Sequence, residues 1–497
     1  MKCLPYPFRS WANLTSLLCV YCLVPIVFFS YHLYSLSGAP WPLINSDVAI
    51  YPLMTYHLTL WDFYYWGQDR IGSIVPFLAA ILVQGVGLDA VDTVTWVVYA
   101  LLLVGWAGVA ILLQSPFLAW VFGVFLLTPP PLFAWLVLAG HPYTGQLFCF
   151  GLMAAALTRW PARWVPPTLV ALAGGSIWAS DFSIMILGAI TATVVVMKAD
   201  LSPFLRPPSV MAGAGALVFL GVAKLTAQYN FWLLGGSPYG YGGYLFTISS
   251  LDGFLLNLRQ FAHRLGGLLR SPPHALLILS GGVAVARLVV LPPSFSKRCS
   301  QVALVSGVTS CLAAAGSHYV ELNGGSIHYL SIAYVFWVLS ILFAVSGEVK
   351  RGWKTAQYFL LTASVILHLA SLVPYAQGLP SARETLHPLL TSGCSAYIGD
   401  YWTAYLIAGM FPDRVLATPR EGLLSTRSRR MRDMVLAQRD ICLVKEGWLE
   451  EFPDEIRQFG HMLTKVGVPQ QYGRFTLCRY RNTENVHSTI GENLPSH

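Results

Sequence analysis

The densest polar and aromatic stretch of this chain is NSDVAIYPLM at residues 45–54, followed by DFYYWGQDRIGS at residues 62–73. Ser46 can cap a helix whose first turn contains Asp47, where the helix dipole favours a carboxylate. An apolar pattern at Val75–Val86 predicts a second short helix, which follows Asp69. Because longer apolar runs lie on both sides, we expect the two short helices to lie along the outer leaflet of a membrane.

The apolar runs on either side predict a polytopic α-helical membrane protein, since a spanning helix needs about 20 mostly apolar residues. The first candidate is Ala12–Tyr34; Lys2 and Arg9 precede it and no small-residue cleavage site follows, which predicts an anchor rather than a cleaved signal peptide. Ten further candidates lie near Val91–Leu113, Phe117–Pro129, Gly145–Thr158, Pro167–Ser180, Phe182–Met197, Val210–Leu225, Ala275–Leu291, Val302–Gly316, Tyr329–Val345 and Gln357–Val373. The sequence therefore predicts about 11 transmembrane helices.

The composition supports this class of protein. Of the 497 residues, 55% are hydrophobic and 11% are charged, and the mean hydropathy is +0.57. A soluble protein carries about 25% charged residues, so much of this surface must face lipid. The net charge of +8 fits Lys and Arg gathered in cytoplasmic loops. The sequence has no RNA- or DNA-binding signature, and we expect no nucleic-acid partner.

The basic residues also orient the spans. If the N-terminus is cytoplasmic, the inner loops hold the basic clusters, as the positive-inside rule requires: Arg159/Arg163, Lys198/Arg206, Lys297/Arg298 and Lys350/Arg351/Lys354. An odd number of spans then places the C-terminal tail outside. We therefore expect a multi-pass inner or plasma membrane protein whose tail is periplasmic or extracellular. Its first external loop, about residues 36–91, carries the two interfacial helices.

The external segment Leu251–Arg270 departs from the charge rule, because it contains Arg259, Arg264 and Arg270. Its apolar residues recur at helical spacing, so we expect an amphipathic helix in the outer interface. The Gly- and Tyr-rich residues 235–244 predict either a mobile loop over a site or a plain connection.

The tail has a different pattern. Apolar runs at Arg414–Ala417, Ile441–Val444 and Phe475–Tyr480 alternate with charged helical patterns at Ser425–Gln438 and Trp448–Lys465. This alternation predicts a small external α/β domain over residues 374–497, after a transmembrane domain over residues 1–373. The nine cysteines predict no zinc site. Any disulfide would come from the last three, Cys394, Cys442 and Cys478.

The first loop resembles that of bacterial GT-C glycosyltransferases, distant relatives of protein mannosyltransferases and lipid A aminoarabinose transferases. That family carries an acidic residue after its first span and then a YGQxYxGS-like segment, to which Asp47 and residues 63–73 are similar. Pro52 stands where many relatives have Gly. The resemblance implies a GT-C fold, with Asp47 as the catalytic base and with substrate-binding neighbours at Gln68, Asp69 and Arg70.

Weaker motifs extend the resemblance over most of the chain. Residues 140–143 lie in a short external loop where relatives place a polar residue, and residues 174–181 are similar to a GLxxWxxP segment at an outer helix end. Residues 323–330 are similar to NxxxRYLxP, with His where the family has Arg, and residues 399–405 resemble the start of the family's soluble tail. The resemblance implies further substrate-binding roles for His141, Tyr143, Asp181, His328 and Tyr329.

The family chemistry explains why these residue types are needed. Such enzymes transfer a sugar from a polyprenyl-phosphate carrier, and the resemblance implies that donor here, with a glycan, a lipid or a protein as acceptor. A carboxylate can take the proton of the acceptor hydroxyl in one inverting step. The leaving phosphate needs cationic or hydrogen-bonding groups, for which the candidates are Arg70, His328 and Arg259 or Arg264. A divalent metal is compatible with this chemistry but not required by it.

Each candidate also has a purely structural explanation. Asp69 and Arg70 can pair with each other, His141 can satisfy a helix end, and His328 can pack within its loop. Two other functions also fit a membrane protein of this kind: a flippase for lipid-linked sugars, and a non-catalytic subunit of an envelope polysaccharide complex. The polar motifs crowd at one face of the membrane, whereas transporters pair broken helices at mid-depth, which favours an enzyme.

Overall fold

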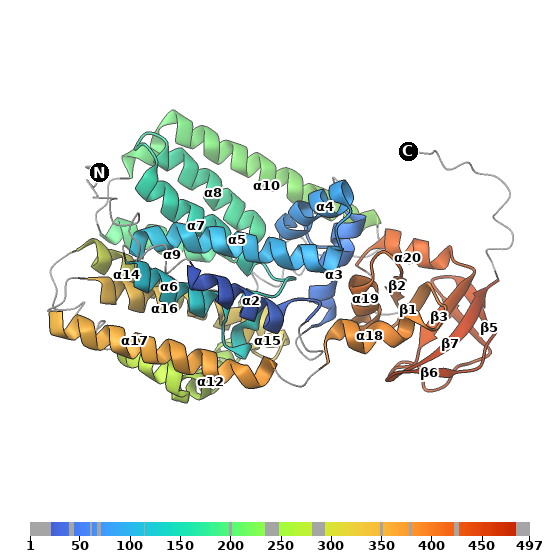
Figure 1. Ribbon diagram of the computed structural model, residues 1–497. Helices are drawn as coiled ribbons and strands as arrows, with labels where there is room; N and C mark the ends of the chain where they lie inside the picture. Colours follow the sequence, from blue (N-terminus) through green and yellow to red (C-terminus); the bar gives the residue numbers. More distant parts are fainter. Residues whose placement is uncertain are drawn as a thin grey trace.

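The computed structural model describes residues 21–38, 44–59, 62–66, 71–113, 115–197, 201–233, 248–280, 294–347, 351–376, 380–421 and 427–483. Within these ranges, a helical bundle is followed by a domain built on a β-sheet (Figure 1). The α-helices of the bundle and of the loops at its end are α2 (Leu23–Tyr34), α3 (Ser46–His57), α4 (Ile74–Val86), α5 (Ala90–Leu113), α6 (Pro116–Leu127), α7 (Tyr143–Arg159), α8 (Val165–Ala179), α9 (Ser183–Val196), α10 (Pro207–Leu233), α12 (Leu251–Arg270), α14 (Phe295–Ala315), α15 (His318–Leu322), α16 (Ser331–Ser346) and α17 (Arg351–Leu372).

The bundle is of the membrane type. Four described segments are long and apolar enough to cross a membrane: Ala90–Leu113, Pro207–Tyr229, Ile327–Ser346 and Gly352–Tyr375. Five shorter apolar helices accompany them, namely α2, α4, α6, α8 and α9. Large apolar side chains on these helices are exposed, such as Val196, Leu217 and Phe359 at 72–80%, which suits contact with lipid. The count of about 11 spans stays a prediction, because the candidates at 12–34 and 275–291 lie partly outside the described residues.

Glycine contacts bring the central helices of the bundle unusually close. A Cβ on Gly108 of α5 would come within 1.9 Å of the carbonyl oxygen of Gly151 on α7, and one on Gly105 would come within 2.7 Å of the carbonyl oxygen of Leu147. Small residues at such positions allow backbones to approach and pack without the hydrophobic effect, which is absent in lipid. The start of α7 is thereby fixed against α5.

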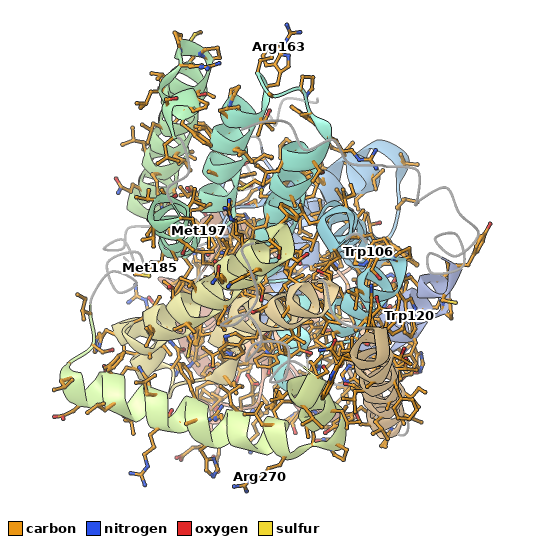
Figure 2. The ribbon with its side chains drawn as sticks, turned by 90° about the vertical axis from the view of Figure 1, so that its left-hand side faces the viewer. Trp106, Trp120, Arg163, Met185, Met197 and Arg270 are labelled. Atoms are coloured by element: carbon orange, nitrogen blue, oxygen red, sulfur yellow. A yellow bond between two sulfur atoms is a disulfide. The ribbon has the colours of Figure 1, made fainter. Side chains whose placement is uncertain are left out.

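The amphipathic helix has the bounds that its sequence predicts. Helix α12 covers Leu251–Arg270, and Figure 2, which views the bundle from the end opposite the sheet domain, shows it stretched across the lower edge of the molecule. Phe261 and Leu268 are buried, whereas Leu255 and Leu256 on its other side are exposed. The predicted helix over these residues is therefore confirmed, while its place in the outer interface stays a prediction. The Gly- and Tyr-rich residues 235–244 lie outside the described residues.

The C-terminal domain contains helices α18 (Ala382–Leu390), α19 (Tyr401–Met410) and α20 (Arg429–Leu436) and a seven-stranded sheet. The strands are β1 (Ala396–Gly399), β2 (Leu416–Pro419), β3 (Asp440–Val444), β4 (Glu455–Gln458), β5 (His461–Lys465), β6 (Gln470–Tyr472) and β7 (Phe475–Asn482). The order is β2-β1-β3-β7-β5-β4, with β6 beside β7; β1 runs parallel to β2 and β3, and the other pairs are antiparallel. The predicted α/β class is confirmed, while the boundary at residue 373 stays a prediction.

One secondary-structure prediction in this domain is wrong. The charged pattern at Trp448–Lys465 predicts a helix, but the structure contains the hairpin β4–β5 there, in register at Gln458 and His461. Phe459 and Gly460 between them both have positive φ, at 52° and 89°. Two consecutive residues with positive φ form the tight turn that suits a two-residue hairpin. Sheet pairing and this turn therefore override the helical spacing of the charges.

The C-terminal domain packs directly onto the helix that carries Asp47. Figure 1 shows α3 and α4 at the end of the bundle that faces α18 and α19. Gly409 of α19 lies so close to α3 that an added Cβ would come within 2.0 Å of the carbonyl oxygen of Ala49. Because the obstruction is backbone, it cannot be relieved by a side-chain rotation.

Replacing Gly409 with Ala should therefore separate α19 from α3. Overpacking of a tight contact costs about 1–3 kcal/mol, so the melting temperature of the purified protein should fall, and any activity that depends on Asp47 should fall with it. Gly447 of the same domain is a matched control, because a Cβ there would meet no atom within 4 Å. Its Ala variant should melt with the parent. An unchanged melting temperature for Gly409→Ala would contradict the close contact.

Candidate active site

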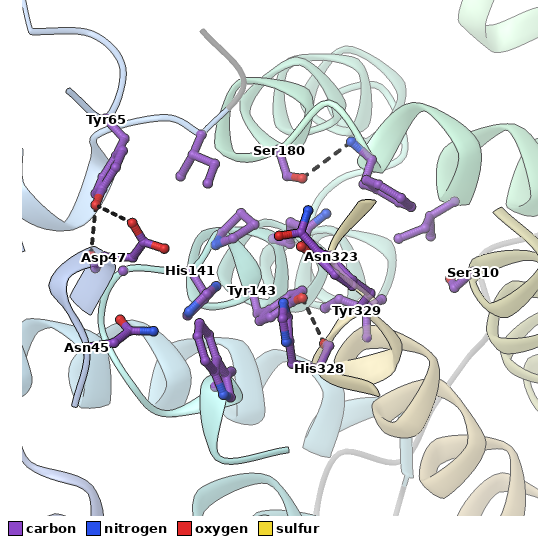
Figure 3. A pocket seen from close by; sticks show the side chains of 18 of the residues that line it. Asn45, Asp47, Tyr65, His141, Tyr143, Ser180, Ser310, Asn323, His328 and Tyr329 are labelled. Atoms are coloured by element: carbon purple, nitrogen blue, oxygen red, sulfur yellow. Dashed lines mark hydrogen bonds between the residues drawn. The ribbon is translucent and has the colours of Figure 1, made fainter. Parts of the chain in front are cut away.

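A cavity of about 210 Å³ lies at the end of the bundle that faces the C-terminal domain. Figure 3 shows side chains converging on it from α3, from the turn before α7 and from the short helix η5 (Ile327–Leu330) that leads into α16. Five of the residues that the sequence predicts for the site line this one cavity: Asp47, His141, Tyr143, His328 and Tyr329.

Asp47 is held by the geometry of the first turn of α3. The predicted cap residue is wrong by one position: the side-chain oxygen of Asn45, not that of Ser46, accepts the backbone N–H of Val48 at 3.1 Å. The Ser46 hydroxyl instead points across to α19, where it lies 2.9 and 2.6 Å from the carbonyl oxygens of Tyr401 and Trp402. Both contacts fix the helix start, and Asp47 follows within the same turn.

The carboxylate of Asp47 contacts a tyrosine from the C-terminal domain. The Tyr401 hydroxyl donates to Asp47 Oδ1 at 2.5 Å. The Tyr65 hydroxyl lies 3.5 Å from the same oxygen and 3.0 Å from the Asp47 carbonyl (Figure 3). Burial, followed by the charge of Asp47, raises the pKa of both phenols well above the usual value. Both hydroxyls therefore stay protonated and act as donors to the carboxylate.

Behind Tyr401 lies a cation, Arg427. Its Nε is 3.4 Å from the Tyr401 hydroxyl, and its guanidinium is 5.3 Å from the centre of the Tyr401 ring. Burial lowers the pKa of Arg427, but Tyr401 and Asp47 raise it more, so the net shift is above the usual range. Arg427 is thus a permanent cation on the C-terminal domain that stabilises the negative charge of Asp47 across one tyrosine.

The opposite wall is a group of aromatic and imidazole rings. Trp135 of the short helix η3 (Pro131–Leu136) stacks on His328, with ring centres 4.5 Å apart, and meets His141 edge-on at 3.7 Å. The Tyr143 hydroxyl donates to the His328 carbonyl at 2.8 Å, which ties α7 to η5. Burial and the neighbouring His328 lower the pKa of His141 well below its usual value, so this imidazole is neutral.

A glycine brings this wall against the helix of Asp47. Gly140 has φ +95°, and an added Cβ would come within 2.7 Å of the Asp47 carbonyl and 2.8 Å of the Val48 Cα. Positive φ and close backbone approach both favour glycine. The turn that carries His141 is therefore packed directly on the first turn of α3.

Asp181 does not line the cavity, although Ser180 and Phe182 on either side of it do. Its buried carboxylate pairs with Lys224 of α10 at 2.7 Å. A buried charge needs such a partner, and this pair holds the turn between α8 and α9. The same turn also contacts the segment before α4 through the β-bridge between Ile71 and Ser180.

The remaining predicted residues fall into two groups. Gln68, Asp69 and Arg70 lie outside the described residues, between Trp66 and Ile71, which are described. Arg259 and Arg264 are exposed on α12 and do not line the cavity, although Arg264 is near enough to His328 to interact electrostatically.

Sequence reasoning missed three residues that the structure places at the site. Tyr401 falls within the segment that resembles the start of the family's tail, so a signal for it existed. The sequence gives no signal for Trp135, which lies in an apolar run, or for Arg427, which lies in a basic run. In the described ranges no three His, Cys, Asp or Glu side chains gather closely enough to hold a metal ion.

Comparisons with known proteins give the fold. Neither a protein-family model nor a curated protein matches the chain by sequence. Among solved structures, the chain is similar to ArnT from Cupriavidus metallidurans in the apo state, with a TM-score of 0.56 and 11% identity over 96% of this chain and 99% of that chain. It is similar to the same protein bound to undecaprenyl phosphate, with a TM-score of 0.58 at the same identity and coverage.

A weaker similarity, with a TM-score of 0.44 and 11% identity, links 86% of the chain to 69% of the archaeal oligosaccharyltransferase AglB from Archaeoglobus fulgidus. ArnT, a lipid A aminoarabinose transferase, is a member of the GT-C superfamily. The chain therefore has the GT-C fold over nearly its whole length. The resemblance of the first loop to this superfamily is confirmed at the level of the fold.

Proposed function

We propose that this chain is a glycosyltransferase that moves a sugar from a polyprenyl-phosphate-linked donor to an acceptor, with inversion at the anomeric carbon. The observation that carries the proposal is the position of Asp47, whose carboxylate lines a cavity between the apolar bundle and the C-terminal domain. A lipid carrier can approach such a site from the bundle while a water-soluble acceptor approaches from the other side. ArnT, which is similar in fold, has been solved with undecaprenyl phosphate.

In the proposed step, the oxygen of the acceptor hydroxyl attacks the anomeric carbon while Asp47 takes the hydroxyl proton. A glycosidic C–O bond forms, the C–O bond to the phosphate breaks, and polyprenyl phosphate leaves with the bonding electrons. His328, together with Arg70 and Arg264 or Arg259, is proposed to stabilise the growing negative charge on the phosphate. The acceptor is a glycan, a lipid or a protein.

We further propose that the reaction takes place on the outer face of the inner or plasma membrane, with the N-terminus in the cytoplasm. Two observations support this orientation. The basic loops of the sequence fall on the cytoplasmic side in this arrangement. Cys394 and Cys442 of the C-terminal domain form a disulfide, and disulfides persist mainly in oxidising compartments such as the periplasm or the cell exterior.

Reconstitution of the purified protein in lipid vesicles tests the function. Labelled polyprenyl-phosphate sugars are supplied with glycan, lipid and protein acceptors, and both the glycosylated product and the released polyprenyl phosphate are measured. The proposal predicts that the two appear in equal amounts. Movement of the labelled lipid across the vesicle without any product would instead assign the chain as a flippase, and the absence of both would assign it as a non-catalytic subunit.

A further inference from the structure

The cavity beside Asp47 contains a hydrogen-bond acceptor that no described residue satisfies. Gln146, near the start of α7, lines the cavity and is 1% exposed. Its amide nitrogen donates to the Ser183 hydroxyl at 2.9 Å, whereas its Oε1 is buried and has no hydrogen-bond partner among the described residues. Buried amide oxygens in native proteins are nearly always paired. A bound ligand is therefore the natural source of the missing donor.

A pair of serines lies at the nitrogen end of the amide. The Ser183 hydroxyl donates to the Ser176 carbonyl at 2.7 Å and accepts from the Ser176 hydroxyl at 2.8 Å. With its one hydrogen used in this way, Ser183 accepts a hydrogen bond from the NH₂ group of Gln146. Oε1 is therefore the end of the amide that is left without a partner among the described residues.

The rest of the lining decides what kind of ligand fits. Of the described residues around the cavity, Asp47 is the only carboxylate, and none is Lys or Arg. The other polar groups are amides, hydroxyls and imidazoles, including Asn45 and the neutral His141. Aromatic rings such as Trp135 supply the apolar surface, which suits the C–H faces of a sugar ring.

We propose that the sugar held in this cavity is a neutral, hydroxyl-rich unit, and that Gln146 Oε1 accepts a hydrogen bond from one of its hydroxyls. This inference rests on the proposed function and names the substrate class of the same site. Among the described lining residues, a sugar ammonium would find only Asp47 as a counter-charge, and that carboxylate is needed to take the acceptor's proton. A sugar carboxylate would find no Lys or Arg among the described lining residues, because the arginines proposed to act on the phosphate are not among them, and burying an unpaired charge is strongly unfavourable. The volume of 210 Å³ holds about seven waters at ~30 Å³ each, which is the scale of one sugar ring.

Binding measurements on the full-length protein in detergent test the inference separately from catalysis. The four probes are a short-chain prenyl phosphate alone and the same phosphate linked to a neutral hexose, to an aminodeoxypentose and to a hexuronic acid. The neutral hexose conjugate should bind about 10-fold more tightly than the prenyl phosphate, which is the effect of about one net hydrogen bond. The two charged conjugates should bind about 10-fold or more weakly than the hexose conjugate.

Two variants and a control locate the preference. Gln146→Leu should lower affinity for the hexose conjugate about 10-fold while affinity for prenyl phosphate is unchanged. Gln146→Glu should shift the preference toward the aminodeoxypentose, because it adds a carboxylate to the lining. Gln357 of α17 is the matched control: it is 2% exposed and its amide has no hydrogen-bond partner among the described residues either, but it does not line the cavity. Gln357→Leu should leave all four affinities unchanged.

The outcomes separate this inference from the function on which it rests. Equal affinity of the parent for the hexose and aminodeoxypentose conjugates would overturn the inference, as would unchanged hexose affinity in Gln146→Leu, and either result would leave the proposed transferase standing. The comparison among probes needs no variant, so a poorly folding variant does not remove the test. Failure of the parent to bind any of the four probes would overturn the proposed function itself.

Discussion

Replacing Asp47 with Asn should lower kcat for sugar transfer by about 10²–10⁴-fold, which is the usual contribution of a positioned general base. The amide has nearly the size of the carboxylate and can still accept the Tyr401 hydroxyl, which lies 2.5 Å from Asp47 Oδ1. The cavity and the KM for the donor should therefore change little. What the variant lacks is an oxygen basic enough to take the acceptor's proton. Initial rates over a range of donor concentrations separate kcat from KM.

Asp252 provides the matched control for this variant. It also lies in the first turn of a helix, α12, but it is exposed and does not line the cavity. Asp252→Asn should transfer sugar at the rate of the parent. If the Asp47 variant also kept the parent's kcat, Asp47 would be rejected as the base, while the assignment of the fold would stand.

Replacing Arg427 with Met should lower kcat by about 10²-fold, because a small displacement of a catalytic group has an effect of that size. Arg427 does not line the cavity; it acts as a positioning residue through Tyr401, which it contacts at 3.4 Å. Methionine keeps most of the length of the side chain but removes the cation. The Tyr401 hydroxyl then loses one hydrogen-bond partner. The carboxylate of Asp47 loses the stabilising charge of the cation behind Tyr401.

Three further variants distinguish positioning from general destabilisation. Arg427→Lys keeps the charge and should recover part of the lost kcat, and Tyr401→Phe should lower kcat without removing the cation. Arg429→Met, two residues further on, changes an exposed side chain that pairs with Asp433, and should leave kcat unchanged. If Arg427→Met and Arg427→Lys lowered the melting temperature equally while kcat per folded molecule stayed constant, the positioning role would be refuted.

Much of the fold could be predicted from local pattern. The apolar spacing of Leu251–Arg270 predicts a helix with the bounds found in the structure, because such spacing depends only on the helix itself and the surface on which it lies. The hairpin at Glu455–Lys465 could not be predicted in this way, since it depends on the pairing of β5 with β7 and on a turn with two positive φ angles. Long-range pairing leaves little trace in a short window of charges.

Part of the cavity lining was predictable residue by residue, but not as an assembly. Asp47, His141 and His328 each lie in a recognisable motif. Those motifs do not indicate that the three segments line one cavity. Arg427 could not be found, because it lies 380 residues from Asp47 and reaches it only through Tyr401. Its function depends on the docking of α19 on α3 at Gly409, and a close backbone contact of that kind has no compositional signature.

The disulfide between Cys394 and Cys442 joins cysteines 48 residues apart, and the segment it encloses contains both Tyr401 and Arg427. In the proposed orientation, these thiols can be oxidised only after export. A newly made chain would thus already contain Asp47. The segment that carries Tyr401 and Arg427 would not be closed by the disulfide until the two thiols have been oxidised.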